Sequence, residues 1–549
     1  METTPVIIRS QPGIKRDGTK FEGDFYVDGQ WVRFQRGLPR KIGGYTAINR
    51  YLSEISRGIK TYTENGGTYF HSGSASFIER FVIDGQGATS LVINRTPLTL
   101  NANEANKWQF DVMYDSSGIP PVNMLIAQVA PNGNCICNNV GGQLFVGELT
   151  GTSALQEVTV FPAGANITGG VCVLHPYLTY FGTDGFLGWS VAGQPTNLTG
   201  VGAGNARIAA QKIVKGLPLR GGPGNAPAGL YWSADAVIRC SFVGGNSVFQ
   251  FDTISSNSSI LSPNSVIEYD GQYFWAGTDR FLMFNGVVRE IPNNLNINYF
   301  FDGLNRAASQ KVFAYKIPRY GEIWWCYPRG DATECTHAVI FNIKENTWYD
   351  TELPNGGRSA GEFSPVYAAP LLTGVKQAAF RPNYRVTENG DIRITEEGDE
   401  RIVEAEEGFL VWQHEKGTDE VDGQFITAIP SWFETADMSF LVGGNPRNKW
   451  IRVEMIEPDF VQSQNMTVQL TGRANAKAGE VKGPERIIYD QPSTPYEQVV
   501  WFKEERRELR LKFTSNTING DYQMGQVIAH IAPADGNVLG AVADEEGSA

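Results

Sequence analysis

The sequence predicts an all-β protein in which a β-propeller of about six blades carries an appended β-sandwich platform domain. Three observations predict this fold class. A strand–turn–strand motif returns along the middle of the chain, and aromatic and β-branched residues, which favour strands, fill the runs between turns. The last quarter of the chain alternates apolar and polar residues with a period of two, as strands with one buried face do. The 61 glycines among 549 residues suit a chain with many tight turns.

The returning motif is the most informative feature. Tyr177-Leu-Thr-Tyr-Phe-Gly-Thr-Asp184 recurs as Tyr273-Phe-Trp-Ala-Gly-Thr-Asp279, and their glycines lie 95 residues apart (277 − 182). A degraded copy, Ser233-Ala-Asp235, stands roughly halfway. A hairpin that returns every ~45–50 residues is typical of propeller blades, because a single four-stranded sheet must stack on neighbours to bury both faces.

The chain before and within the propeller divides as follows. Residues 1–45 are predicted to form an N-terminal arm and a hairpin, since Asp28-Gly29 is a strong hairpin turn between two short strands. Residues 46–421 hold the propeller. Phe300 to Gln310 is expected to be a short helix, and Asn101 to Gly118 matches no blade strand. The six predicted blades cover about 58–83, 125–161, 171–205, 212–251, 265–291 and 312–349.

An acidic insertion interrupts the propeller at about 381–410. Units of eight residues begin at Arg385, Arg393 and Arg401, each with a short strand and an acidic glycine turn. The insertion is either a solvated β-meander or an acidic projection that lines a channel or touches a partner. A third interpretation is a calcium site built from Glu396, Glu397 and Asp399, although EF-hand spacing is missing. The acidic residues that would face a channel or a partner are Glu388, Asp391, Glu396, Glu397, Asp399, Glu400, Glu404, Glu406 and Glu407.

Residues 422–533 are predicted to form the β-sandwich. Trp450 to Met455, Met466 to Leu470 and Leu509 to Phe513 each alternate with period two, so each has one apolar and one polar face. The final stretch, 534–549, is small and acidic and is expected to be a flexible tail.

No catalytic constellation is found in the sequence. The five histidines stand in no zinc-hydrolase motif, no nucleophile elbow or phosphate-binding loop occurs, and the six cysteines include no C-x-x-C pair. We therefore predict no enzymatic activity, no cofactor and no metal. The recurring residues of the blade turns are expected to be structural, with the aspartates hydrogen-bonding their own turns. They are Gly182, Asp184, Asp235, Gly277 and Asp279.

Charge and hydropathy exclude further classes. The formal charge is −13, whereas nucleic-acid-binding proteins gain affinity by neutralising phosphates with basic residues. No apolar run is long enough for a transmembrane helix, so no membrane insertion is expected. The start lacks the basic and apolar regions of a secretory signal, which predicts synthesis and residence of the thiols in a reducing cytosol.

Several segments resemble one family, the tail nozzle proteins of short-tailed bacteriophages, also called tail hub, tail tubular or packaged-DNA stabilisation proteins. The segment with the most specific resemblance is the glutamate–tryptophan strand that begins at Glu322. The segments are Lys41-Ile-Gly-Gly-Tyr45, Gly277-Thr-Asp-Arg-Phe-Leu-Met-Phe-Asn-Gly286, Pro292-Asn-Asn-Leu-Asn-Ile297, Glu322-Ile-Trp-Trp-Cys-Tyr-Pro328, Ala338-Val-Ile-Phe-Asn342, Trp348 and Arg506-Arg-Glu-Leu-Arg-Leu-Lys-Phe513.

This resemblance implies a structural protein of the virion tail, made in the bacterial cytoplasm. It implies a homohexameric ring around the DNA exit channel, attached to the adaptor (the head-to-tail connector) below the portal and docking tail fibres, spikes or tail-tip proteins. Double-stranded DNA would pass transiently and without specific binding, and a negative lumen would keep that passage fast. The arm and the sandwich are expected to pack together and to face the adaptor.

Two other functions stay open at this point. The chain could be a propeller that binds a glycan or a protein, which a sugar-binding monomer would favour. It could also be a tail-associated glycan hydrolase, which would need two carboxylates ~5–10 Å apart in an aromatic-lined groove.

Overall fold

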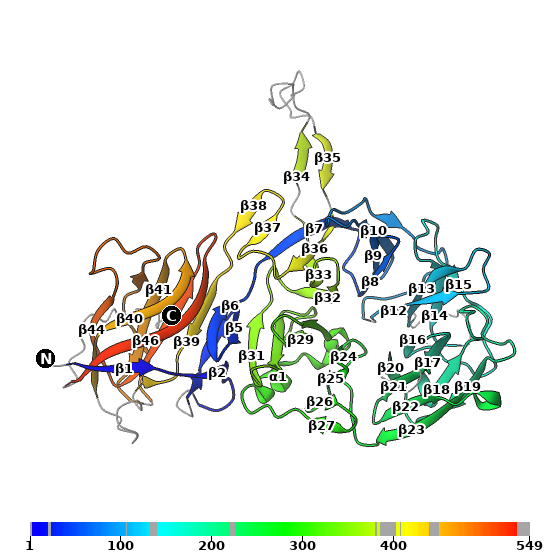
Figure 1. Ribbon diagram of the computed structural model, residues 1–549, viewed down its shortest axis with the longest axis horizontal. Coiled ribbons are helices and arrows are strands. Elements are labelled where there is room, and N and C mark those ends of the chain that lie inside the picture. Colours follow the sequence, from blue (N-terminus) through cyan, green and yellow to red (C-terminus); the bar gives the residue numbers. More distant parts are fainter. Residues whose placement is uncertain are drawn as a thin grey trace.

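The computed structural model describes residues 3–19, 24–105, 107–130, 140–219, 226–378, 381–384, 402–406, 408–438, 450–475 and 477–534. The fold is all-β, as the sequence predicts, and consists of many small, mostly antiparallel sheets. Figure 1 shows two parts, an array of sheets on the right and a smaller group of strands from both chain ends on the left. Among the described residues, no helix combines the length and the apolar character needed to cross a membrane.

Six sheets of the array each consist of four consecutive strands of the chain. The first two sheets are β8 (Gly58–Glu64), β9 (Gly67–Gly73), β10 (Ile78–Ile83), β11 (Ile93–Asn94), and β12 (Gln109–Asp115), β13 (Val122–Val129), β14 (Gln143–Glu148), β15 (Gln156–Glu157). The next two are β16 (Gly170–Leu174), β17 (Tyr177–Phe181), β18 (Phe186–Trp189), β19 (Gly204–Arg207), and β20 (Ile213–Pro218), β21 (Ala228–Ser233), β22 (Val237–Phe242), β23 (Phe249–Ser255). The fifth and sixth are β24 (Ile267–Tyr269), β25 (Gln272–Ala276), β26 (Phe281–Phe284), β27 (Val288–Glu290), and β28 (Phe313–Ile317), β29 (Glu322–Tyr327), β30 (His337–Asn342), β31 (Thr347–Glu352).

A seventh sheet joins the two ends of this region. Its strand order is β32 (Arg358–Ser364), β33 (Ala369–Gln377), β36 (Phe409–His414), β7 (Tyr45–Leu52), β37 (Glu420–Asp422) and β38 (Phe425–Thr427). Strand β7 comes from the N-terminal side of the array and pairs antiparallel with β36, which lies more than 350 residues later in the chain. The described array thus has one sheet more than the six units read from the sequence.

Neighbouring sheets of the array pack face to face through aromatic side chains. Trp232 of β21 and Trp275 of β25 have ring centroids 5.6 Å apart, and Phe281 of β26 lies 5.0 Å from Trp325 of β29. Every residue of β29 is buried. A strand covered on both faces favours consecutive apolar residues, as in Ile323-Trp-Trp-Cys-Tyr327 of β29, and shows no polar alternation.

The first strands of the sheets lie side by side at the centre of the array. Strand β8 contacts β12, β12 contacts β16, β16 contacts β20, β24 contacts β28, and β28 contacts β32. Strand β32 of the last sheet also contacts β8 of the first. Segments at opposite ends of the region therefore meet.

We call the second part the platform; it has two six-stranded sheets. One contains β1 (Thr4–Ile8), β5 (Val32–Gln35), β6 (Leu38–Lys41), β40 (Ile451–Ser463), β44 (Val500–Arg506) and β46 (Asp521–Pro533). The other contains β4 (Asp28–Gln30), β39 (Ser431–Glu434), β41 (Met466–Arg473), β42 (Val481–Lys482), β43 (Arg486–Ile488) and β45 (Glu508–Ser515).

Both chain ends build the platform, and the arm packs with the C-terminal segment as the sequence predicts. The predicted hairpin turn at Asp28-Gly29 is wrong, because Asp28–Gln30 is strand β4 and the hairpin of the arm is formed by β5 and β6. Strand β46 pairs with β1, and β39 pairs with β4. Phe433 of β39 contacts Tyr522 of β46 at a centroid distance of 5.7 Å, so the two sheets share a core. The segment 420–427, which the sequence assigns in part to this domain, instead pairs with β7 of the array.

The remaining elements are short. The predicted helix between Phe300 and Gln310 corresponds to α1 (Ile297–Gly303) followed by a 3-10 turn at Arg306–Lys311. Among the described residues, two further 3-10 turns occur at Thr183–Gly185 and Gly245–Ser247. Strand β2 (Gln11–Ile14) pairs parallel with β3 (Phe25–Tyr26). Strands β34 (Arg381–Tyr384) and β35 (Ile402–Glu406) form a hairpin that stands away from the array (Figure 1).

Candidate functional site

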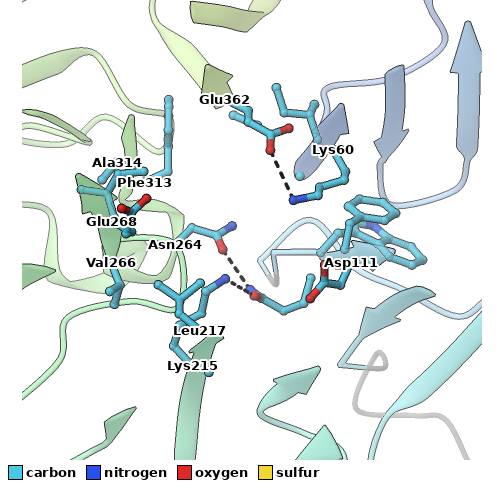
Figure 2. A pocket seen from close by; sticks show the side chains of 18 of the residues that line it. Lys60, Asp111, Lys215, Leu217, Asn264, Val266, Glu268, Phe313, Ala314 and Glu362 are labelled. Carbon is cyan, nitrogen blue, oxygen red and sulfur yellow. Dashed lines mark hydrogen bonds and ion pairs between the residues drawn. The ribbon is translucent and has the colours of Figure 1, made fainter. Parts of the chain in front are cut away.

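The array encloses a central cavity of about 430 Å³. Residues from the first strand of all seven sheets line it, and Figure 2 shows how their polar side chains point inward. Segment 101–118, which the sequence leaves outside the blades, supplies one of these strands, β12. Gln109 and Asp111 of this strand alternate with Phe110 and Val112, and both line the cavity.

An ion pair in the cavity connects the first sheet of the array to the last. Lys60 Nζ of β8 lies 3.4 Å from Glu362 Oε1 of β32 (Figure 2). Glu362 Oε2 also accepts a hydrogen bond of 2.6 Å from the backbone N–H of Thr61. The Glu362 carboxylate is the main reason that the pKa of Lys60 lies above its ordinary value.

A chain of hydrogen bonds spans the cavity. Lys215 Nζ of β20 donates to Gln109 Oε1 of β12 at 2.5 Å, and Gln109 Nε2 donates to Asn264 Oδ1, just before β24, at 2.9 Å (Figure 2). Burial lowers the pKa of Lys215 to about 8, and the nearby charge of Lys60 acts in the same direction.

Two further contacts link neighbouring first strands. Asp111 Oδ2 of β12 accepts a hydrogen bond of 2.8 Å from the backbone N–H of Val173 in β16. Lys316 Nζ of β28 lies 3.1 Å from Glu268 Oε2 of β24. Charged and amide side chains thus bridge adjacent sheets at the centre of the array, where these sheets share no continuous backbone ladder. The arrangement stabilises the array, and its carboxylates and ammonium groups are largely paired with each other.

The predicted blade-turn residues lie at equivalent positions. Gly182 and Asp184 lie between β17 and β18, Asp235 between β21 and β22, and Gly277 and Asp279 between β25 and β26. Their contacts differ from the predicted capping: Asp184 pairs with an arginine at 3.5 Å, Asp279 with an arginine at 2.9 Å, and Asp235 accepts a hydrogen bond from a serine hydroxyl.

Residues preceding these sheets hold two of the turns instead. Asn166 Oδ1 accepts a hydrogen bond of 2.9 Å from the backbone N–H of Thr183, and Ser259 Oγ accepts one of 3.0 Å from that of Thr278. A Cβ atom at Gly182 would lie 2.0 Å from Asn166 Oδ1, so the motif glycine makes room for this link. The repeat in the sequence marked the turns but not the linker residues that bind them.

The predicted acidic positions fall mostly outside the described residues. Glu404 and Glu406 belong to strand β35, of which the backbone is described. The positions outside the described residues are Glu388, Asp391, Glu396, Glu397, Asp399, Glu400 and Glu407. The calcium interpretation rests on three of them; in the part of the chain that the structure covers, no group of three or more His, Cys, Asp or Glu side chains is placed to hold a metal ion.

A buried charge cluster joins the platform to the array. Arg33 of β5 is 1% exposed and reaches Glu322 of β29, which is fully buried, with Nε 2.9 Å from Oε1. Arg33 also donates to Glu415 at 2.6 Å. Trp324 Nε1 and the Tyr349 hydroxyl donate to Glu322 at 2.9 and 2.7 Å. The sequence marks Glu322 as a feature of interest, but nothing in it identifies Arg33 as the partner.

Comparison with known proteins adds no identity. No protein-family model matches the sequence, and no curated protein matches it either.

Proposed function

We propose that this chain is a structural subunit of a bacteriophage tail, a nozzle or hub protein that surrounds the DNA exit channel as a ring of six copies. In this proposal the array is a seven-bladed β-propeller and the platform is a β-sandwich. The ring attaches to the adaptor below the portal and docks fibres or tail-tip proteins, and the subunit catalyses no reaction.

The observation that carries the proposal is the joint between the two parts. Strands from both chain ends interleave in the platform, and Arg33 of the platform is buried against Glu322 of the array and Glu415. A buried ion pair with further hydrogen bonds from Trp324 and Tyr349 holds the two parts at one angle. A subunit of fixed shape suits a ring that holds the adaptor and the tail tip in a constant relative position. The resemblance implies a ring between these two parts.

The DNA channel of this proposal lies between copies and not within one array. The central cavity has the volume of a small-molecule site, and the hydrogen bonds from Lys215 through Gln109 to Asn264 span it. A duplex therefore needs a wider passage, which several copies together would enclose. The formal charge of −13 supports a lumen that repels DNA.

The alternative is a glycan- or protein-binding propeller, or a glycan hydrolase. The cavity volume of about 430 Å³ favours a small ligand at that place. Its polar side chains are engaged with one another, however, so a ligand there would have to replace the bonds made by Lys60, Lys215 and Gln109.

The mass of the purified protein, measured by light scattering alone and with the phage adaptor, tests the proposal. We expect a mass near six chains, or a ring that forms only with the adaptor. A monomer that does not bind the adaptor but binds or cleaves a polysaccharide would overturn the proposal in favour of the alternative.

A further inference from the structure

Three turns meet on the surface beside the joint. The β5–β6 turn contains Arg36, which has a φ of 56°, and its backbone N–H donates to Glu345 in the β30–β31 turn at 2.7 Å. Lys344 in that same turn donates through Nζ to the backbone oxygen of Arg319 in the β28–β29 turn at 2.9 Å. Platform and array residues thus form one continuous surface.

This surface is rich in unneutralised positive charge. We call Arg36, Arg40, Arg319 and Lys344 the basic patch. Arg36, Arg319 and Lys344 are exposed and Arg40 is half-buried. Among the described residues, no side chain of the four forms an ion pair with a carboxylate; Arg40 donates to Gln35 and Lys344 to a backbone oxygen.

Tyr320 lies at the centre of the patch and orders the cations around it. The guanidinium carbon of Arg319 lies 5.3 Å from the centroid of its ring and that of Arg40 lies 5.8 Å away. Buried Arg33 approaches the ring to 3.8 Å and holds it in place from within. Glu345, in the β30–β31 turn, accepts hydrogen bonds from the backbone N–H groups of Arg36 and Gly37 and keeps its charge, so four cationic side chains face one carboxylate. The patch is therefore a preformed site for an anionic partner in a protein with an overall charge of −13.

The same chain carries a segment of the opposite charge. We call residues 381–407 the acidic hairpin, after the paired strands β34 and β35 near its two ends. The segment contains nine carboxylates against four arginines and no lysine. Strands β34 and β35 pair only with each other and with no other sheet of the described chain. They stand out from the array in Figure 1. A two-stranded hairpin alone is marginally stable in water, so it gains from docking on a second surface.

We propose that the acidic hairpin of one copy docks on the basic patch of a second copy. This inference rests on the proposed function, because it requires copies that stand side by side. The docking joins each copy to the next, head to tail, which is the geometry that a closed ring requires. Charge complementarity sets the register of such a contact and makes it sensitive to salt.

Double-stranded DNA is the competing partner for a basic patch. Four cations could contact phosphates, but the remaining surface of this acidic chain would repel a duplex. The acidic hairpin is tethered to every copy of the ring and is thus present at high effective concentration. The observations favour the hairpin.

The experiment uses three variants that each keep both the array and the platform. The first reverses the patch, Arg319→Glu with Lys344→Glu. The second, which we call hairpinless, replaces residues 379–407 with an Asn-Gly turn; the ends of this segment meet, since Ala378 N–H donates to Gly408 O at 2.7 Å. The third is the control Arg289→Glu, which reverses an exposed charge on β27, away from the patch turns. Thermal melting checks that each variant is folded.

Light scattering and sedimentation then measure association at low and high salt. We expect the wild type and Arg289→Glu to assemble. The patch-reversed and hairpinless variants should need at least a tenfold higher protein concentration to associate. A mixture of the patch-reversed and hairpinless variants should give a complex of two chains and no larger species. The hairpinless copy has an intact patch, and the patch-reversed copy has an intact hairpin. Assembly that is unchanged in both variants overturns the inference.

Carbodiimide cross-linking of mixed light and heavy isotope-labelled wild-type chains locates the contact. We expect links between Lys344 of one copy and carboxylates of 388–407 of another. Links only within a copy, or a duplex mobility shift that disappears in the patch-reversed variant, overturn the inference, the latter in favour of DNA. A six-chain ring without these links leaves the proposed function intact, whereas a linked pair that never forms a ring or binds the adaptor contradicts the function alone.

Discussion

Buried charged residues determine how the two parts of this protein are joined. Arg33, Glu322 and Glu415 bring together a platform strand, an array strand and the loop after β36. Burial raises the pKa of Glu322, while the Arg33 charge opposes that effect. A buried ion pair contributes little compared with an apolar pair, but the loss of one partner leaves the other charge uncompensated. The cluster therefore serves mainly to fix how the platform and the array are placed relative to each other, and it contributes less to the free energy of unfolding.

Glu322→Gln should destabilise the protein by about 3 kcal/mol, because Arg33 would stay buried with Glu415 as its remaining carboxylate. Chemical denaturation followed by tryptophan fluorescence measures the change, since Trp324 donates to this carboxylate. The control is Glu290→Gln at a half-exposed position, where we expect a change within about 0.5 kcal/mol. Equal midpoints for the two variants would show that the joint does not depend on this charge.

Stability should depend on pH through Glu504. Burial raises the pKa of Glu504 to about 7, although Arg506, at 3.0 Å, and Arg486 oppose the shift. Because the folded-state pKa lies above the unfolded value, the folded state binds the proton more tightly. The stabilisation is thus complete below about pH 4.5 and is lost as the pH rises through about 7.

The folded and unfolded pKa values of Glu504 differ by about 2.5, which at about 1.4 kcal/mol for each pKa unit corresponds to about 3.4 kcal/mol. Solvent screening weakens this contribution, and we expect a fall of about 2 kcal/mol across this range from Glu504. Glu504→Gln should flatten that slope, which denaturation midpoints at pH 5, 6, 7 and 8 would measure. The Glu290→Gln variant should keep the wild-type slope. A slope that survives in Glu504→Gln would assign the pH dependence to other groups.

At the scale of elements, the glycine of the returning motif fixes where one sheet meets the linker before it. Gly182 has an extended backbone, so its role is space and not a special conformation. Its missing side chain allows Asn166 to reach the turn and accept the N–H of Thr183. A linker residue thereby holds the start of one hairpin to the segment that enters the sheet.

Gly182→Ala should therefore destabilise the protein by about 1–3 kcal/mol, the usual cost of forcing an atom into a packed site. Gly85→Ala is the matched control, since a Cβ there would have no neighbour within 4 Å. Thermal melting of the two variants makes the comparison. If Gly182→Ala melts together with Gly85→Ala, the turn can move to accept the methyl group and the link to Asn166 is dispensable.

At the scale of the whole molecule, the two chain ends fold as one unit. Strands β1 and β6 pair with β46, and β4 pairs with β39, so residues before 45 complete both platform sheets. Tyr26, Trp31 and Phe34, all about 1% exposed, enter the same core as the C-terminal strands. The platform is thus not an independent C-terminal domain.

Removal of residues 1–44 should unfold the platform. The loss of three buried aromatic side chains, at about 3–5 kcal/mol each, approaches or exceeds the ~5–15 kcal/mol that stabilises a typical domain. Binding of a fluorescent apolar dye should rise strongly, and the melting transition of the platform should disappear. A truncated chain that stays monodisperse and binds no dye would mean that 431–534 folds without the arm.

Much of the fold could be predicted from local patterns. The motif around Gly182 and Gly277 and the aromatic strand at Glu322 mark β17–β18, β25–β26 and β29, because turns and doubly covered strands leave a local signature. Strand β12 was missed, although Gln109 and Asp111 alternate with Phe110 and Val112 as in a strand with one polar face. The seventh sheet was missed because β7 and β36 come from distant parts of the chain.

The candidate site was predictable only in part for the same physical reason. The composition of the chain and the spacing of its motifs predict an all-β fold with repeated hairpins and an acidic insertion. These features depend on residues that are close together in the sequence. Three features depend on residues that are far apart in sequence: the pairing of β7 with β36, the chain of bonds from Lys215 to Asn264 and the pairing of Arg33 with Glu322. Such contacts form only when packing brings their strands together, so they leave no periodic mark on the chain and only the folded arrangement reveals them.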